Sequence, residues 1–199
     1  MAQLNFTEKI ILEDEHVLLR PLETTDVEYL GPFTISEPDI WKYSLAQPVG
    51  IEGMQQYINT AVSAREAGRE YPFIVYDKKQ QAYAGSTRFY DIQLSYSTLQ
   101  LGYTWYGKQF QGTGLNKHCK FLLLQLAFEQ LGMERVEFRA DNSNEKSIAA
   151  MKSIGCTVEG VLRSHTPKHG GGRRDSIILS ILKDEWLEGL KDKLQTKLS

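Results

Sequence analysis

A glycine-containing turn near the middle of the chain has the residue types that bind phosphate. It reads Phe110-Gln111-Gly112-Thr113-Gly114-Leu115-Asn116-Lys117. Glycine lets the backbone approach a ligand closely, and the first N–H groups of a helix point at whatever lies at its positive end. The turn therefore predicts a site for a pyrophosphate group.

Two better-known phosphate loops do not fit this turn. The P-loop pattern would use Gly107 and Gly112, but Thr113-Gly114 stands where it requires a lysine followed by serine or threonine. The dinucleotide fingerprint would use Gly112 and Gly114, but Lys117 occupies its third glycine position. The sequence supports neither ATP hydrolysis nor NAD binding.

The segments on either side must position the turn. Leu99 to Tyr106 alternates in polarity and is rich in aromatic and β-branched residues, which predicts a half-buried strand. Leu115 to Leu131 follows with the pattern of a helix. The turn thus joins the end of a strand to the start of a helix.

The rest of the chain supplies further strands and helices. We expect a helix capped by Thr24 or Thr25, and Pro32 to Pro48 reads as a loop. A run of strands followed by helix–strand alternation predicts an α/β fold with a mixed sheet flanked by helices. The other expected strands are Val17 to Leu22, Tyr71 to Tyr76, Ala82 to Tyr90, Arg135 to Ala140, Cys156 to Arg163 and Ser176 to Leu182, and the other helices are Ile51 to Ala67, Glu145 to Ile154 and one at the C-terminus.

Composition limits the partners of the chain. At 199 residues and 41% hydrophobic content, it is long enough for one sizeable core, and we expect a single domain over residues 1–199. A net charge of −2, from 23 basic and 25 acidic residues, gives no general attraction to nucleic acid or to an anionic membrane. The longest apolar run, Phe121 to Phe128, is too short to span a bilayer, and the N-terminus has no signal-like core. We therefore expect a cytoplasmic protein.

The two cysteines are Cys119 and Cys156. With so few, a structural disulfide is not expected. Cys156 follows Gly155 directly, where a buried apolar role is the favoured interpretation over a nucleophile, because a free cysteine behaves as a small hydrophobic residue.

The turn resembles motif A of the GNAT acyltransferase superfamily, Gln/Arg-x-x-Gly-x-Gly/Ala, whose backbone amides hold the pyrophosphate of acetyl-CoA. Two registers fit: Gln109-x-x-Gly112-x-Gly114 and Gln111-x-x-Gly114-x-Asn116. We prefer the second, because the family places an aromatic residue just before the Gln. In that register Asn116 replaces the usual small residue.

Landmarks downstream extend the resemblance, in the same order, over roughly Val17 to Trp186. Together they resemble the GNAT branch that acetylates the amino termini of ribosomal proteins. This resemblance implies a mostly antiparallel central sheet in which two middle strands, at Leu99–Tyr106 and Arg135–Ala140, splay apart around the pantetheine arm of the coenzyme. The other landmarks are Asn144 to Ser147, Ala149 to Gly155, Glu159 to Arg163 and Arg174 to Ser176.

The resemblance also implies which residues bind acetyl-CoA, the co-substrate. Asn144 should cap a helix and hydrogen-bond the pantetheine amides, and an oxyanion donor should be a backbone N–H at the end of the strand before motif A. Lys117 and Lys120 either reach the phosphates or form an exposed helix face. The expected coenzyme-binding residues are Thr104, Trp105, Tyr106, Gln111, Gly112, Thr113, Gly114, Leu115, Asn116, Lys117 and Asn144.

Two side chains are candidates for proton transfer. Glu137 is the candidate base, directly or through water, and its alternative is a solvated glutamate on a strand face. Many relatives use a Tyr as acid, but Met151 occupies that position and cannot donate. Ser147 is the candidate replacement, because the ribosomal-protein branch also has Ser there; its alternative is a first-turn helix residue without chemistry.

The glycine-rich loop from His165 to Arg174 borders the acceptor site in relatives. Its two histidines, His165 and His169, lack a third ligand nearby, so we expect no metal. A flexible turn could admit a peptide end, and Arg173 or Arg174 could attract an acidic substrate. A solvated surface loop is the alternative.

The predicted function is transfer of an acetyl group from acetyl-CoA directly to a primary amine, most simply a protein N-terminus of the ribosomal type. One alternative acceptor is a small amine such as a polyamine, an amino sugar or an antibiotic. Another alternative is a non-catalytic acyl-CoA-binding sensor, and a nucleic-acid module is disfavoured by charge. The apolar stripe of the last helix either packs on the sheet or forms a homodimer contact; it comprises Trp186, Leu187, Leu190 and Leu194.

Overall fold

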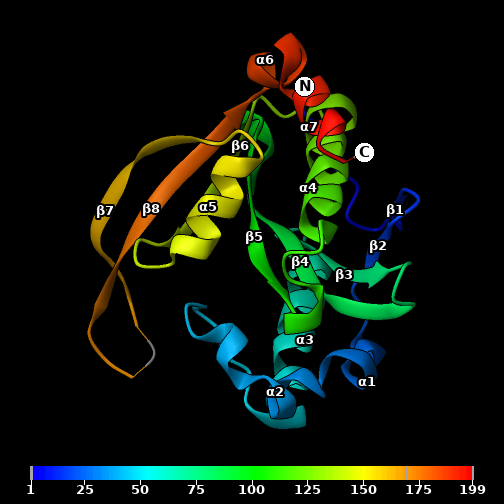
Figure 1. The fold of residues 1–199 in the computed structure, drawn as a ribbon, viewed down its shortest axis with the longest axis vertical. Helices are drawn as coiled ribbons and strands as arrows, with labels where there is room; N and C mark the ends of the chain where they lie inside the picture. Colours follow the sequence, from blue (N-terminus) through cyan, green and yellow to red (C-terminus); the bar gives the residue numbers. More distant parts are fainter. Residues whose placement is uncertain (1, 169, 199) are drawn as a thin grey trace.

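The computed structural model describes residues 2–168 and 170–198 (Figure 1). They contain an eight-stranded sheet in the order β1-β2-β3-β4-β5-β6-β8-β7, antiparallel throughout except between β5 and β6. This confirms the predicted mixed, mostly antiparallel sheet. The strands are β1 (Leu12–Glu13), β2 (Val17–Pro21), β3 (Tyr71–Asp77), β4 (Ala82–Gln93), β5 (Thr98–Tyr106), β6 (Arg135–Asp141), β7 (Thr157–Pro167) and β8 (Arg173–Leu182).

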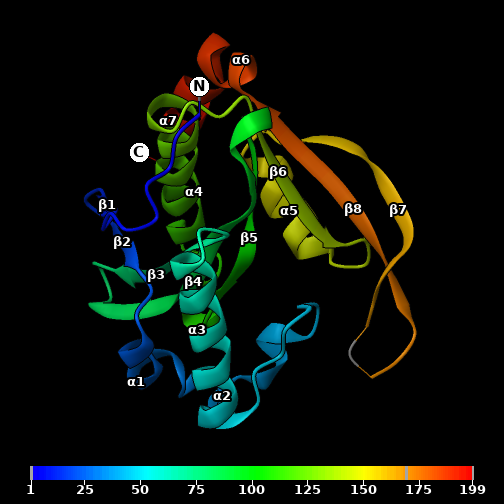
Figure 2. The ribbon, with the colours of Figure 1, turned by 180° about the vertical axis from the view of Figure 1, so that it is seen from behind.

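Helices flank both faces of the sheet, and Figure 2 shows α3 in front of the strands it covers. Long helices lie where the sequence predicts them. The helical segments are η1 (Thr24–Asp26), α1 (Val27–Leu30), α2 (Phe33–Ser36), η2 (Pro38–Trp41), α3 (Gly50–Glu66), η3 (Leu94–Tyr96), η4 (Lys108–Phe110), α4 (Leu115–Gln125), η5 (Leu126–Gln130), α5 (Glu145–Ser153), α6 (Lys183–Glu185), η6 (Trp186–Leu190) and α7 (Lys191–Thr196).

Two local predictions near the N-terminus are wrong. The first helix is capped by Glu23, not by Thr24 or Thr25, because the Asp26 carboxylate accepts a hydrogen bond from the Glu23 N–H at 2.8 Å. The expected loop from Pro32 to Pro48 contains two short helices. The second of them places Trp41, whose ring is buried against Trp105 with the ring centres 4.8 Å apart.

The C-terminal part also departs from the prediction. The β7–β8 hairpin is longer than expected and pairs out to Pro167↔Arg173, so little of the glycine-rich loop remains a turn. The stripe of the last helix divides: Trp186 and Leu194 are buried in the main core, whereas Leu187 is 60% exposed. Packing therefore explains the two buried residues of the stripe.

The core has two parts, one on each face of the sheet. The larger lies between the sheet and α4, α5 and the C-terminal helices, and includes Leu99, Phe138 and Met151. The smaller lies between the opposite face and α3, and includes Trp105.

The sheet opens between β5 and β6. These strands pair only from Thr98↔Arg135 to Gln100↔Glu137. Beyond that point β5 continues beside β4 and β6 continues beside β8, so the two middle strands diverge (Figure 1). This confirms the predicted splay, and the turn of interest lies at the end of β5.

Candidate active site

Side chains within the glycine turn hold it closed. Gln111 Nε2 donates to the Tyr106 carbonyl at 2.9 Å, and Thr113 Oγ1 donates to the Phe110 carbonyl at 2.9 Å. These two side chains therefore shape the loop between β5 and α4 and leave its backbone to face a ligand.

Both glycines of the turn have backbone conformations that favour glycine. Gly112 has φ of +75° and Gly114 has φ of +95°, and Gly114 is the N-cap of α4. A Cβ atom at either position would meet nothing within 4 Å. The space beside the turn is therefore open.

Several backbone donors of the turn are unpaired. The N–H groups of Gly112, Thr113, Gly114 and Asn116 find no acceptor among the residues that the structure describes, and the Leu115 N–H makes only a long contact of 3.4 Å with Thr113 Oγ1. Such a set of donors at a helix N-terminus binds anions. The Lys117 N–H is used within the turn, donating to the Gly114 carbonyl at 2.8 Å.

Asn116 carries an acceptor that the protein does not use. Its Oδ1 atom is buried and has no hydrogen-bond partner in the described part of the chain. Next to the open N–H groups, this atom fits a ligand that has both phosphate oxygens and a hydrogen-bond donor, as acetyl-CoA has. Leu115, by contrast, packs its side chain into the core and offers a ligand only its backbone.

The end of β5 also offers backbone rather than side chains. Trp105 and Tyr106 are 6% and 7% exposed and pack in the two cores. The Thr104 hydroxyl is hydrogen-bonded to that of Thr87 at 2.7 Å. Only the main chain of these predicted residues is available to a reacting carbonyl group.

Lys120 does not lie on a solvated helix face, so that alternative for it is wrong. It is 5% exposed, and its Nζ atom donates to Thr104 Oγ1 at 2.8 Å and to Thr87 Oγ1 at 3.4 Å. Burial lowers the pKa of this lysine to about 8. The sequence signal was helical spacing, since Leu123 and Leu124 lie three and four residues on and are fully buried.

Helix α5 approaches the opening from the β6 side. Asn144 is its N-cap, as predicted, and its side-chain oxygen accepts a hydrogen bond from the Ser147 N–H at 3.1 Å. The Ser147 side chain is half-buried, and its hydroxyl makes no hydrogen bond to another described residue. Met151 is buried in the core. The Ser147 hydroxyl, which has no partner among the described residues, therefore lies one helical turn before the Met151 thioether.

Glu137 faces away from its buried neighbours Val136 and Phe138, as alternation predicts. Its carboxylate is not simply solvated, because it accepts hydrogen bonds from Arg139 Nε at 2.7 Å and from Arg135 Nη2 at 3.3 Å. Arg135 also donates to Glu159 at 2.6 Å. Hydrogen bonds from Ser180 and Arg135 lower the pKa of Glu159. The face of β6 opposite α4 thus carries a connected charge cluster.

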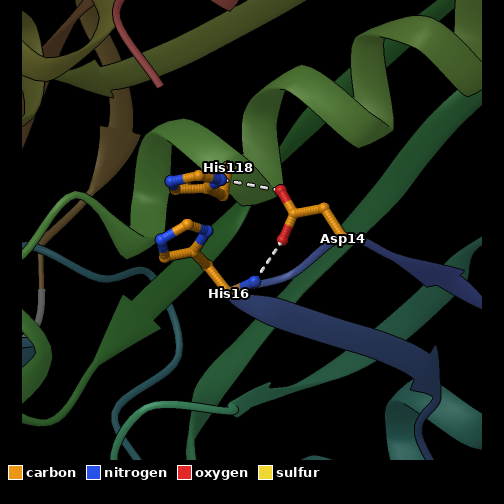
Figure 3. Close-up of side chains that lie close together, drawn as sticks. All are labelled: Asp14, His16 and His118. Carbon is orange, nitrogen blue, oxygen red and sulfur yellow. Dashed lines mark hydrogen bonds and ion pairs between the residues drawn. The ribbon is translucent and has the colours of Figure 1, made fainter. Parts of the chain in front are cut away.

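An aspartate–histidine pair fixes the first turns of α4. Asp14 Oδ2 lies 2.7 Å from His118 Nδ1, and Oδ1 accepts a hydrogen bond from the His16 N–H (Figure 3). Oδ1 also accepts a hydrogen bond from the Val17 N–H. Burial opposes ionisation of Asp14, but these hydrogen bonds outweigh it and lower its pKa. Since both carboxylate oxygens are occupied and the His16 ring stacks on His118, we assign the group a positioning role.

A groove of about 450 Å³ lies beside the end of β6. One wall comprises Asp141 at the end of β6, Arg174 on β8 and Lys168 directly after β7. Lys42 and Tyr43, in the loop after η2, line the other wall. Arg174 donates to the Tyr43 carbonyl at 3.2 Å, so it joins the two walls.

The two predicted arginines of the hairpin therefore differ. Arg173 is exposed and bonded to Ser164, whereas Arg174 is 7% exposed and lines the groove. His165 lies 3.0 Å from the Ser176 hydroxyl, and His169 lies outside the described residues.

Neither cysteine is suited to nucleophilic chemistry. Cys119 and Cys156 are both free and buried, and burial raises the pKa of each to about 12. The predicted buried role of Cys156 is confirmed. Among the described residues, no helix has both the length and the apolar character needed to cross a membrane.

The diverging strand pair lies beside a helix N-terminus whose open N–H groups suit a phosphorylated ligand. The chain belongs to the GNAT family: the model of the acetyltransferase (GNAT) domain matches residues 16–157. It is therefore an acetyltransferase of this family.

The chain is similar to known proteins along most of its length. "Putative ribosomal N-acetyltransferase YdaF" of Bacillus subtilis (strain 168) is 29% identical over 89% of this chain and 97% of its own length. A GCN5-related N-acetyltransferase from Brucella melitensis has the same fold, with a TM-score of 0.90, 24% identity and coverage of 100% of this chain and 90% of that one. The microcin C7 self-immunity acetyltransferase MccE, solved with acetyl-CoA and AMP, has a TM-score of 0.75 at 23% identity, covering 85% of this chain and 93% of its own.

Proposed function

We propose that this enzyme acetylates the α-amino group of a protein chain, of the kind found in ribosomal proteins, by direct transfer from acetyl-CoA. The observation that carries the coenzyme site is the set of open N–H groups from Gly112 to Asn116 at the mouth of the β5–β6 divergence. The similarity to YdaF, a putative ribosomal N-acetyltransferase, supports the choice of acceptor.

In this proposal the turn holds the coenzyme and the opening of the sheet holds the reacting end. The free N–H groups of the turn bind the pyrophosphate, and Asn144 hydrogen-bonds the pantetheine arm. A backbone N–H of Thr104 to Tyr106 stabilises the oxyanion, a contribution of about 3 kcal/mol in related chemistry. The protein thus positions acetyl-CoA mainly with its backbone.

Proton transfer falls to Glu137 and Ser147. Each carboxylate oxygen of Glu137 has two lone pairs, and the arginines use one on each. Since the side chain is 18% exposed, we propose that Glu137 takes the amine proton through a water molecule. Ser147 donates a hydrogen bond to the coenzyme sulfur from the α5 side.

We propose the groove beside β6 as the acceptor site. Asp141 offers a carboxylate to an incoming ammonium group, and hydrogen bonds from Ser143, with the nearby cation of Lys168, outweigh burial and lower its pKa. Lys42, Lys168 and Arg174 offer donors for peptide carbonyl or carboxylate groups. Three cations against one carboxylate disfavour a polyamine.

A second acceptor class has one observation in its favour. The same excess of cations suits a small amine that carries a negative charge. A protein N-terminus and such an amine differ in length, so a substrate panel separates them.

The test incubates the purified protein with acetyl-CoA and a panel of N-terminal peptides, anionic small amines and polyamines, following thiol release and confirming products by mass spectrometry. Turnover of one class of peptide is the expected result. Turnover of small amines alone would overturn the peptide proposal, and coenzyme binding without any turnover would overturn the catalytic assignments.

A further inference from the structure

Lys120 is a buried cation with incomplete hydrogen bonding. An ammonium group has three N–H donors, and the acceptors in the described residues are Thr104 Oγ1 at 2.8 Å and, more distantly, Thr87 Oγ1 at 3.4 Å. The two hydroxyls also bond to each other at 2.7 Å. One donor of the lysine is therefore left for another acceptor.

This cation has no compensating opposite charge in the described part of the chain. Among the described residues, no carboxylate forms an ion pair with Lys120. The titratable groups that face it are Cys119 on its own helix and Cys156 after α5, and Tyr106 lies against Cys119 from β5. Both thiols are neutral near pH 7, because burial raises the pKa of each to about 12. A buried, unpaired charge is costly, and proteins keep such groups mainly at functional sites.

The cation lies at the opening of the sheet. The last paired residues of β5 and β6 are Gln100 and Glu137. Thr104, which accepts a hydrogen bond from Lys120 Nζ, lies four residues further along β5. Phe138, whose ring centre is 6.0 Å from Nζ, lies one residue further along β6. Lys120 therefore bridges the two strands where they separate, under the first turns of α4.

We propose that the Lys120 ammonium group stabilises the coenzyme A thiolate that acetyl transfer releases. This inference rests on the proposed coenzyme site. Many relatives use a tyrosine as the acid at the position that Met151 occupies here. In this chain Lys120 supplies a charged donor instead.

The chemistry balances without a further reactant. The amine nitrogen forms a bond to the acetyl carbon, the carbon–sulfur bond breaks, and sulfur leaves with the electron pair. Lys120 donates its open N–H to that sulfur, and the proton lost by the amine leaves through water at Glu137. The lowered pKa of Lys120, about 8, lies close to that of a thiol, so the two groups are well matched for a short hydrogen bond or proton transfer.

The first experiment titrates the thiol of coenzyme A bound to the protein, by ultraviolet thiolate absorbance, with desulfo-coenzyme A as the blank. The protein's own thiols stay protonated over the pH range in which the coenzyme thiol ionises, because burial raises the pKa of each to about 12. We expect the bound thiol to have a pKa at least about one unit lower in the native protein than in Lys120→Met, a tenfold difference in thiolate. Equal values would overturn the inference.

Measuring the affinity for coenzyme A distinguishes a failure of the proposed coenzyme site from a failure of the Lys120 proposal. If neither protein binds coenzyme A, the coenzyme site itself is wrong; if both bind it with equal thiol pKa values, only the role of Lys120 is wrong. Ser147→Ala provides the comparison for a donor on α5.

Should Lys120→Met not fold, the native protein still provides a test. The pKa of the Lys120 side chain, followed by NMR, should rise when coenzyme A binds at a pH where its thiol ionises, and should rise less with desulfo-coenzyme A. Equal shifts with the two ligands would contradict the proposal.

Discussion

Two groups of polar residues flank the same opening of the sheet, and they differ in whether their hydrogen bonds are complete. Around β6, Glu137 and Glu159 share Arg135, and Arg139 completes the cluster. Around the start of α4, four backbone N–H groups, Asn116 Oδ1 and one donor of Lys120 have no partner among the described residues. The protein itself supplies the hydrogen-bond partners of the first group, whereas the second group has donors and an acceptor that a ligand could bind.

This difference separates residues that stabilise from residues that bind. Asn116 Oδ1 is buried, and a buried polar atom without a partner costs about 1–3 kcal/mol, a sizeable fraction of the stability of a domain. Gly112 and Thr113 are exposed, so water can reach their N–H groups at little cost. A ligand that supplies the missing partners recovers that cost on binding. The incomplete group is therefore where the coenzyme is expected, and changes there should alter binding more than folding.

The largest expected effect comes from filling the open space beside the turn. Gly114→Leu places a side chain where no protein atom lies within 4 Å of the Cβ position, in the proposed path of the pyrophosphate. Coenzyme A affinity, measured by calorimetry, should fall by about 1,000-fold because several charge-assisted hydrogen bonds are lost.

Gly189→Leu is the matched control. Gly189 has φ of +126° and also has open space at its Cβ position, so this variant carries similar backbone strain in the C-terminal helices. Affinity that falls equally in both variants would show that strain, rather than the turn, is responsible.

The second effect is a pH dependence of stability that Lys120 should produce. Its pKa falls from the usual 10.5 to about 8 on folding, so the unfolded chain binds more protons between these values. The free energy of unfolding attributable to this group should therefore rise with pH across that window, by up to about 3 kcal/mol.

Lys120→Met should remove this rise and be more stable than the native protein near pH 7. Denaturant unfolding at several pH values measures both quantities. A variant that is less stable at every pH would mean that the lysine is a structural residue with satisfied interactions.

How far sequence predicts this site depends on the kind of interaction. The turn, the N-cap Asn144 and the divergence of the strands follow from local residue types and from family resemblance, and the structure has them where predicted. The burial of Lys120 and the pairing of His118 with Asp14, 104 residues away, depend on tertiary packing. Helical spacing with Leu123 and Leu124 indicates that Lys120 is buried, but short-range patterns do not contain its contact with Thr104 or the Asp14–His118 pair.

The third prediction concerns Glu137, in the charge cluster on β6. Glu137→Gln should lower kcat/KM by about 100-fold, with the greatest loss at low pH, where more of the amine is protonated, if this residue accepts the amine proton. Glu129→Gln is the control, because Glu129 has a comparable ion pair with Lys191 at 2.8 Å far from the opening. A pH–rate profile that keeps its shape in Glu137→Gln would assign Glu137 to the charge cluster alone.

The smallest effect is expected at α5. Ser147→Ala removes a hydroxyl that has no partner in the described structure, so stability should change little while kcat falls by about tenfold. Ser153→Ala, on the last turn of the same helix, removes a hydroxyl bonded only to a nearby carbonyl and should leave kcat unchanged. A drop in coenzyme affinity at constant kcat would make Ser147 a binding residue instead.

The most direct test of the central claim follows the backbone amides of the 199-residue protein by NMR while coenzyme A is added. The account predicts that the amide signals of Gly112, Thr113, Gly114 and Asn116 shift most, because these are the donors that the coenzyme pyrophosphate would occupy. Signals that move instead around Arg135, Glu137 and Glu159, with the glycine turn unchanged, would contradict it.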